Sequence, residues 1–231
     1  LENKLDKDTC IGVDLGLSIP AVCSVNMGSE RLFIGSYDDF IRIRTQMQAR
    51  KRSLQKSLTL TKGGKGRKKK LKALDRLKDK ERNWVKTYNH TLTNRIVKFA
   101  VENQASKIKL EFLEGYGEKE PDSFVLRNWS YYEMQTMIEY KAKREGIEIV
   151  TIDPYHTSQT CSYCGHYEDG QRLEQSKFQC KNPDCPNKDK KGINKIENAD
   201  WNASKNIALS DKVVTKRSQC EYYMKKKLEK N

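Results

Sequence analysis

Residues 10–16 read Cys10-Ile-Gly-Val-Asp-Leu-Gly16, an apolar stretch that carries one carboxylate. We expect a strand here, with Asp14 near its end and Gly16 supplying a turn. Ala21-Val-Cys-Ser-Val25 follows as the return strand, and Arg31-Leu-Phe-Ile34 forms a third. Short strands joined by tight turns are typical of antiparallel pairing. The sequence therefore predicts a sheet that begins with three antiparallel strands and holds a charge on an otherwise buried strand.

The next part of the chain has the pattern of two long helices, over residues 40–60 and 68–104. In the second helix, apolar residues recur at three- and four-residue steps and form one stripe, which consists of Leu71, Leu74, Leu77, Trp84, Tyr88, Leu92, Ile96 and Phe99. A basic, glycine-rich loop over residues 61–67 is expected to separate the helices.

Strands and helices then alternate. Residues 107–113 form a predicted strand that contains Glu111, residues 127–145 a helix that ends at Gly146, and residues 148–152 a strand stopped by Asp153-Pro154. After a cysteine-rich insert, a last helix begins near Asp200. This order predicts an α/β fold with a mixed sheet flanked by helices. The tail from Lys212 is polar and basic, and we expect a frayed helix there.

Composition points to a polyanionic partner. The 231 residues carry a formal net charge of +14, and nucleic acid is the commonest partner of so basic a chain. The charge is concentrated: residues 41–100 hold 20 Lys or Arg and only three acidic residues, whereas the other 171 residues are close to neutral. No apolar run approaches the roughly 18–20 residues of a membrane span. Because the chain starts with Leu1 rather than Met, we expect it to be part of a longer protein.

The cysteine spacing predicts a zinc site. Two residues separate Cys161 from Cys164, fifteen residues follow, and four residues separate Cys180 from Cys185. Two such pairs can supply four thiolates in tetrahedral geometry. They would fill all four coordination positions of Zn²⁺, so the ion would be structural rather than catalytic. His166 is a weaker alternative ligand. The odd total of seven cysteines and the lack of a signal peptide at the start disfavour a disulfide scaffold, so we expect a reducing, cytoplasmic compartment. Cys10 and Cys23 are expected in the core, and Cys220 lies outside the pattern.

Three carboxylates are candidate metal ligands, namely Asp14, Glu111 and Asp200. They lie far apart in the sequence and meet only if the first and fourth strands are neighbours. Carboxylates that converge repel one another unless cations neutralise them, and Mg²⁺ or Mn²⁺ suits such a site. Two such ions can activate a water and stabilise the leaving oxygen of a phosphodiester. Each acid could instead have a purely structural role, as a turn residue, a helix cap or a solvent-facing side chain. Glu114 is a rival of Glu111, and Asp153 is an auxiliary acid or only the residue before a proline.

The basic helical segment is a candidate nucleic-acid surface. Its densest runs flank the glycine-rich loop and comprise Arg50, Lys51, Arg52, Arg67, Lys68, Lys69 and Lys70. Such runs are often no more than a solvated helix face, yet cations spaced along two helices can follow a phosphate backbone. Nearby aromatic residues offer base stacking as an alternative to core packing, and these are Trp84, Tyr88, Trp129, Tyr131 and Tyr132.

Four sequence strings together resemble the nuclease half of the TnpB proteins and of the miniature type V CRISPR effectors related to them. The strings are Gly12-Val-Asp-Leu-Gly16, Leu110-Glu-Phe-Leu113, Thr157-Ser-Gln-Thr-Cys-Ser-Tyr-Cys-Gly165 and Asp200-Trp-Asn-Ala-Ser-Lys-Asn-Ile207. The resemblance implies an RNase H-like (RuvC) fold with an inserted zinc ribbon. It also implies an RNA-guided DNA endonuclease that depends on Mg²⁺, with Asp14, Glu111 and Asp200 as its metal ligands.

By this resemblance, residues 1–157 form the nuclease core with the basic helical segment 41–104, and residues 158–197 the zinc ribbon that handles target DNA. Residues 198–211 form the last nuclease helix and residues 212–231 a basic tail. Asp14 would bridge two ions, with Glu111 and Asp200 holding one each. The four-residue spacing of the second cysteine pair departs from the two found in many relatives. The family's guide-binding and flanking-motif-reading parts, which normally precede the nuclease half, are not in this chain.

The partners implied are a guide RNA and target DNA in a prokaryotic cytoplasm, with no membrane; participation of a second protomer stays open. Two other functions remain as alternatives. One is a guide-dependent DNA-binding protein or repressor that does not cut. The other is a guide-independent nuclease of the RNase H or resolvase type.

Overall fold

The computed structural model describes residues 4–16, 19–112 and 131–214, and its main feature is a five-stranded mixed sheet. The strands are β1 (Asp6–Asp14), β2 (Ala21–Val25), β3 (Arg31–Ile34), β4 (Ala105–Glu111) and β5 (Glu148–Ile152), in the spatial order β3-β2-β1-β4-β5. The first three strands pair antiparallel, while β4 runs parallel to both β1 and β5. The predicted mixed α/β sheet is confirmed, and the first and fourth strands are neighbours, which is the condition under which the candidate carboxylates can meet.

Helices cover both faces of this sheet. α2 (Gly64–Glu102) and α4 (Tyr131–Arg144) pack on one face, where Ile96 and Ile138 join Ile11 and Ile108 in the main apolar core. α5 (Ala199–Leu209) packs on the other face against β1 and β2. Sheet residues alternate between the two faces, as the pleat of a strand requires.

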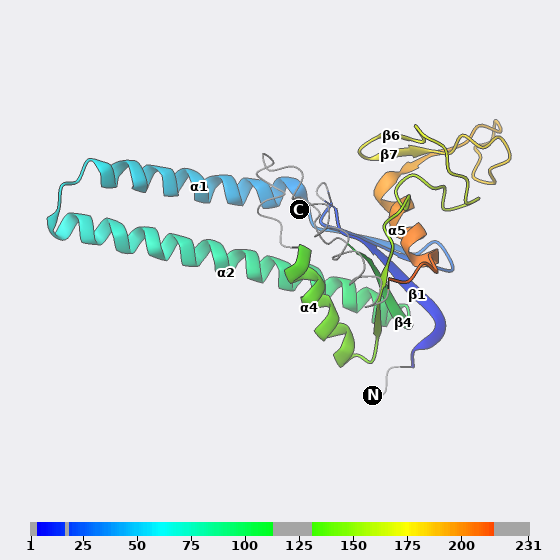
Figure 1. Cartoon of the computed structure of the whole chain (residues 1–231), viewed down its shortest axis with the longest axis horizontal. Coiled ribbons are helices and arrows are strands. Elements are labelled where there is room, and N and C mark those ends of the chain that lie inside the picture. Colours follow the sequence, from blue (N-terminus) through cyan, green and yellow to red (C-terminus); the bar gives the residue numbers. More distant parts are fainter. Residues whose placement is uncertain (1–3, 17–18, 113–130, 215–231) are drawn as a thin grey trace, which may run out of the picture.

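α1 (Tyr37–Thr59) and the first half of α2 form a long hairpin that projects away from the sheet (Figure 1). The predicted loop over residues 61–67 is too long, because α2 already begins at Gly64. Arg67 donates hydrogen bonds to the carbonyl groups of Leu58 and Thr61, and Lys70 donates to that of Ser57. These bonds satisfy carbonyl groups at the end of α1 and support an early helix start despite the glycines.

Residues 158–197, which we call the cysteine module, lie beyond the sheet on the side of α5 (Figure 1). The module contains β6 (Arg172–Glu174) and β7 (Lys177–Gln179), which pair antiparallel, and β7 also pairs antiparallel with β8 (Ile196–Asn198). β8 runs directly into α5, so the module and the last helix are one continuous piece of chain.

Several boundaries differ from the predictions. β4 ends at Glu111, so Phe112 lies outside the strand, and residues 113 and 127–130 are outside the described part of the chain. Residues 212–214 are not helical: Val213 forms an antiparallel bridge with Ile152. Cys10 and Cys23 are buried, as predicted, while Cys220 is outside the described residues. Within the described residues, no helix is long and apolar enough to cross a membrane.

Candidate functional site

Asp14 and Glu111 end adjacent parallel strands and face α5. On β1, the Cys10 thiol lies 3.9 Å from the Ala208 carbonyl oxygen of α5, which places the alternate residues Gly12 and Asp14 on that face. On β4, Lys109 Nζ donates to the same carbonyl at 2.8 Å, and Glu111 is two residues further along. The register pairs the residues just before the two acids, Val13 and Leu110. The two carboxylates therefore stand next to each other at one end of the sheet.

Asp200 reaches this end of the sheet because α5 packs unusually close to β1. A Cβ at Gly12 would lie 2.1 Å from the Ser204 carbonyl oxygen and 2.2 Å from the Ala208 nitrogen, so only glycine fits. Asn198 caps the helix, accepting a hydrogen bond from the Trp201 N–H at 2.9 Å. Asp200 therefore occupies the first turn of a firmly placed helix and is buried.

The three carboxylates interact electrostatically. Burial, and next the charges of Glu111 and Asp200, hold the pKa of Asp14 well above its usual range. Burial also raises the pKa values of Glu111 and Asp200. Like charges that are partly removed from water destabilise one another's ionised forms. A divalent cation bound among these oxygens would remove that repulsion, and hard carboxylate oxygens are the ligands that Mg²⁺ and Mn²⁺ prefer.

An arginine from the cysteine module neutralises part of the negative charge of the three carboxylates. Arg172 Nη2 of β6 lies 3.1 Å from Asp200 Oδ1, and its charge offsets part of the rise that burial causes in the pKa of Asp200 and of Asp14. In the described chain, only the four clustered cysteines offer three or more ligand atoms within 4.8 Å of one another. The carboxylates thus form a more open group than a closed metal cage.

Glu111 is oriented by neighbours from two directions. The Thr157 hydroxyl donates a hydrogen bond to Glu111 Oε1, and Gln135 Nε2 of α4 donates to the Glu111 carbonyl oxygen at 3.0 Å. The charge of Asp153 contributes to raising the pKa of Glu111. Asp153 also accepts a hydrogen bond from the Tyr155 N–H at 3.0 Å. It is therefore both a turn residue and an electrostatic neighbour of the site.

Two asparagines of α5 hold the segment that contains Thr157. Asn202 accepts from the Ser162 N–H at 2.9 Å and donates to the Thr160 carbonyl at 2.7 Å. Asn206 Nδ2 lies 2.8 Å from the Thr157 carbonyl oxygen. These residues are four apart and share one helix face. They fix residues 157–162 onto the helix that carries Asp200.

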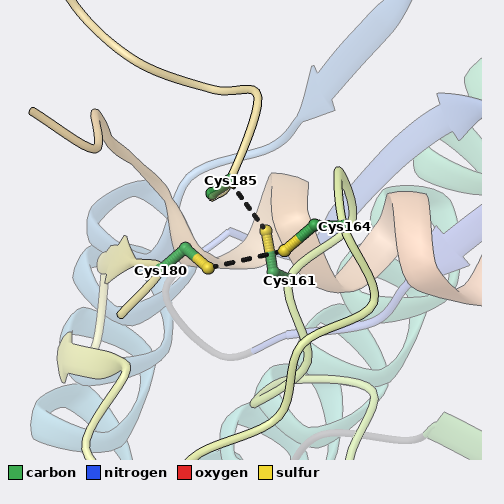
Figure 2. A group of neighbouring side chains, drawn as sticks. All are labelled: Cys161, Cys164, Cys180 and Cys185. Carbon is green, nitrogen blue, oxygen red and sulfur yellow. Dashed lines mark hydrogen bonds between the residues drawn. The ribbon is translucent and has the colours of Figure 1, made fainter. Parts of the chain in front are cut away.

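The four predicted zinc ligands converge in the cysteine module, as Figure 2 shows. Cys161 and Cys185 Sγ are 3.8 Å apart, and Cys164 and Cys180 Sγ are 3.6 Å apart. A tetrahedral zinc ion with Zn–S bonds of about 2.3 Å requires thiolates about 3.8 Å apart. The spacing therefore fits such an ion. His166 does not join the cluster; its Nε2 lies 3.3 Å from Glu168 Oε2.

The module has little apolar core of its own. Its buried cluster consists of Cys161, Cys180 and Cys185 with Phe178 and Ala199, the last being the first residue of α5. Burial raises the pKa of Cys161 to about 11, so without a metal this thiol stays protonated at neutral pH. Cross-linking by a metal would supply the stability that so small a core lacks.

The basic residues named from the sequence divide into two groups. Arg50, Arg52, Lys68 and Lys69 are exposed and appear in none of the ion pairs of the described chain. Arg67 and Lys70 close the end of the hairpin, and Lys51 is half-buried. A shallow groove between α1 and α2 is lined by Arg50, Arg76 and Lys80.

The aromatic residues near the hairpin mostly serve packing. Trp84 stacks on Tyr88 at 5.3 Å between ring centroids, and both pack on Phe40. Tyr132 is 83 % exposed. Trp129 and the rival acid Glu114 lie outside the described residues, as does the side chain of Tyr131.

Sequence reasoning missed Arg172, Thr157 and the asparagine pair as site residues. Two of these could have been found. Thr157 is the first residue of the sequence string 157–165, and Asn202 and Asn206 are four residues apart, which places them on one face of a helix. Arg172 has no local signal, because its role depends on how the cysteine module folds back toward α5.

Comparisons with known proteins agree with this geometry. A family model described as the TNB domain of Cas12f1-like proteins matches residues 131–207, and one described as a probable transposase matches residues 2–115. The chain is 37 % identical to a CRISPR-associated endodeoxyribonuclease Cas12f1 of Syntrophomonas palmitatica, over 90 % of this chain and 46 % of the relative. It is 32 % identical to the protein of the same name from Sulfoacidibacillus thermotolerans, over 91 % of this chain and 48 % of that one.

A solved structure shares the fold. The cryo-EM structure of a Cas12f1–sgRNA–target DNA complex superimposes with a TM-score of 0.70 and 31 % identity, covering 92 % of this chain and 40 % of that protein. The chain thus spans about half the length of the curated relatives it matches.

Proposed function

Because the chain belongs to the family of TnpB proteins and miniature type V effectors, we propose that it is the RuvC-like DNA endonuclease portion of an RNA-guided effector. The observation that carries the proposal is the meeting of Asp14, Glu111 and Asp200 from β1, β4 and α5 at one end of the sheet. The fold would be of the RNase H type, and the charges of both Glu111 and Asp200 act on Asp14.

The trio would hold Mg²⁺ or Mn²⁺. Bound there, divalent ions supply Lewis-acid chemistry for hydrolysis of a DNA phosphodiester. The protein's own part is to fix the carboxylates. Thr157 orients Glu111, the Asn198 cap and the Gly12 contact place Asp200, and burial on β1 restricts Asp14. Arg172 lies beside Asp200 with a positive charge and bidentate geometry that suit a phosphate oxygen.

The cysteine module would be a zinc ribbon over residues 158–197, with Zn²⁺ held by Cys161, Cys164, Cys180 and Cys185. Zinc here is structural, since the four thiols fill its tetrahedral shell. The module ends in β8, which leads into Asn198 and Asp200. A folded ribbon therefore positions both Arg172 and Asp200, which links the zinc site to the nuclease site. The nuclease core would comprise residues 1–157 and 198–211, with a basic tail after it.

The projecting hairpin would follow the phosphates of a guide RNA–target DNA hybrid. Its exposed cations and the groove lined by Arg50, Arg76 and Lys80 provide a backbone contact without sequence preference. Base pairing with the guide would then choose the target. The same proposal places the protein in the prokaryotic cytoplasm, where its DNA lies.

The test is DNA cleavage by the protein expressed from its own gene with its co-purifying RNA. Single-stranded and duplex DNA are offered with Mg²⁺ or EDTA, and Asp200→Asn is the inactive comparison. We expect cutting that needs both Mg²⁺ and RNA and is lost in the variant. RNA-dependent binding without cutting would replace the proposal by a guided repressor. Cutting of branched DNA without RNA would replace it by a resolvase-type nuclease.

A further inference from the structure

An exposed aromatic cluster stands at the edge of the carboxylate site and has no role in holding the fold's core. Tyr155 is 66 % exposed and Tyr167 is 41 % exposed. The His156 ring lies between them, with centroids 3.7 Å from Tyr155 and 4.0 Å from Tyr167. Large aromatic side chains exposed together are unusual on a polar surface and often mark a binding site.

The chain connection places this cluster against the nuclease site. β5 ends beside Glu111, because Ile152 pairs with it, and the next residue, Asp153, acts on Glu111 electrostatically. Thr157 then returns to donate its hydroxyl to Glu111. Tyr155 and His156 lie between these two contacts. The aromatic residues therefore form the outer part of a turn whose two ends both touch the site.

This turn is held in a defined shape. His156 has φ +60°, a left-handed conformation that is costly for a residue other than glycine. Its carbonyl accepts hydrogen bonds from the N–H groups of Gln159 and Thr160. Tyr167 is placed over the ring by an antiparallel bridge to Thr160. A strained turn that is fixed from several sides presents its aromatic rings in advance of ligand binding.

The cluster carries one cation at its Tyr155 end and one carboxylate at its Tyr167 end. Lys212 Nζ lies over the Tyr155 ring, 5.9 Å from its centroid, and the Lys212 carbonyl accepts a hydrogen bond from the Asp153 N–H. The Tyr167 hydroxyl donates to Asp169 Oδ1 at 2.9 Å. An aromatic face next to a cation is the pairing that single-stranded nucleic acid recognises, since the base stacks and the phosphate meets the charge. A base inside a duplex has both faces covered, so only an unpaired base can use such a platform.

We propose that Tyr155, supported by His156 and Tyr167, is a stacking platform for an unpaired nucleobase of the DNA strand that enters the carboxylate site. The inference rests on the proposed function, because it assigns a subsite to the strand being cut. Stacking on the platform holds one nucleotide of the strand at the mouth of the site. Because every base has a π-face, the platform accepts the strand without regard to sequence.

The test compares loss of the ring with loss of the base. A fluorescent thymidine oligonucleotide of about twelve nucleotides, and copies with one abasic nucleotide at successive positions, are titrated in buffer without Mg²⁺, so that no cleavage occurs and the zinc stays bound. We expect one abasic position to weaken wild-type binding about 5- to 10-fold, within the range for one stacked base. Tyr155→Ala should bind the intact strand about as weakly and should no longer respond to the abasic position.

Three variants make the result specific. Tyr155→Phe keeps the ring and should bind like the wild type, whereas Tyr155→Leu keeps apolar bulk without a π-face and should behave like Tyr155→Ala. Tyr140→Ala removes a tyrosine that is 42 % exposed and belongs to α4 rather than to the turn, and it should have no effect. Wild-type affinity in Tyr155→Ala, or an abasic penalty that persists in it, would overturn the platform. Binding is measured without cleavage, so an unchanged affinity in Tyr155→Ala would not contradict the nuclease proposal. Conversely, if the wild type does not cut DNA but Tyr155→Ala no longer responds to the abasic position, the platform is still supported.

Discussion

The Thr157 hydroxyl donates a hydrogen bond to Oε1 of Glu111, and so joins the turn before the cysteine module to the end of β4. Thr157→Val removes the donor and keeps the shape. We expect DNA cleavage to fall about 10- to 100-fold, as small misplacements of reacting groups do, and half-maximal activity to need more Mg²⁺. Thr157→Ser restores the hydroxyl and should restore both. A Mg²⁺ titration of cleavage tests this; equal losses in the Val and Ser variants would contradict it.

Arg172 neutralises Asp200, so its loss should destabilise the metal-free protein. The pair is mostly buried, with side chains 25 % and 7 % exposed. We expect Arg172→Met to lose about 1–3 kcal/mol in Mg²⁺-free buffer that leaves the zinc bound, or about 2–10 °C in Tm for a chain of this size. Mg²⁺ should then stabilise the variant more than the wild type, because the ion takes over the neutralisation.

The matched comparison for Arg172 is Lys177→Met, which breaks the exposed neighbouring pair with Glu174 at 3.0 Å. Exposed pairs contribute only about 0–1 kcal/mol, so its Tm should hardly move. The measurement is a thermal melt of both variants without and with Mg²⁺, with no chelator present. An equal Tm loss in the two variants would mean that Arg172 is an ordinary surface cation.

Asp14→Asn should stabilise the metal-free protein at neutral pH. The pKa of Asp14 is raised in the folded state, so the folded chain binds this proton more tightly than the unfolded chain does. Stability from this group is therefore present at low pH and lost as pH rises from the ordinary aspartate pKa through the raised one. The variant escapes that loss. In Mg²⁺-free buffer we expect a Tm several degrees above wild type at pH 7 and no difference near pH 4.

Asp6 is the control residue, because its pKa is shifted in the opposite direction. Its pKa is lowered by the Thr9 hydroxyl, so Asp6→Asn should give no gain at pH 7 and at most a small loss. Excess Mg²⁺ should reverse the order for Asp14, because the wild type then binds the ion and the variant binds it poorly. If wild type is already the more stable form without Mg²⁺ at pH 7, the trio does not carry the repulsion described.

The approach of Asp14 and Glu111 could be predicted only on the condition that β1 and β4 are neighbours. The strand pattern around each acid is local, and connection rules leave few sheet orders, but the pairing itself joins distant parts of the chain. The start of α2 could not. Glycine is a poor helix former, and only the side chains of Arg67 and Lys70 reaching back to α1 make a helix through Gly64 favourable. Arg172 escaped notice for the same reason, since its contact joins two segments whose approach no local pattern encodes.

Zinc should hold the cysteine module together. We expect one zinc per chain and, after chelation, fast amide exchange throughout residues 158–197 while the β1–β4 ladder stays protected. The reason is the small buried cluster around Phe178. Because burial raises the pKa of Cys161 to about 11, zinc binding must displace protons and should weaken as pH falls. Cys161→Ser should reproduce the chelated pattern and Cys23→Ser should not. Unchanged exchange after chelation would show that the module folds without metal.

The hairpin should carry a salt-dependent share of nucleic-acid affinity. The variant to make replaces by glutamine the four exposed cations Arg50, Arg52, Lys68 and Lys69, and leaves Arg67 and Lys70 in place because they hold the hairpin end. Each phosphate contact adds about 0.9 to the slope of log affinity against log salt. We expect the slope for a 20-base-pair RNA–DNA hybrid to fall by about 3, with weaker binding at low salt.

A second variant with four substitutions distinguishes the effect of where the cations lie from the effect of the protein's net charge. It replaces four exposed lysines away from the hairpin tip by glutamine: Lys4, Lys7, Lys98 and Lys143. Both variants lose four charges, so any long-range effect of net charge is equal in the two. Only the hairpin variant should lose about three units of slope, because counterions are released only where cations meet phosphates. Equal slopes in the two variants would mean that the hairpin cations are a solvated face and that the hybrid is held elsewhere.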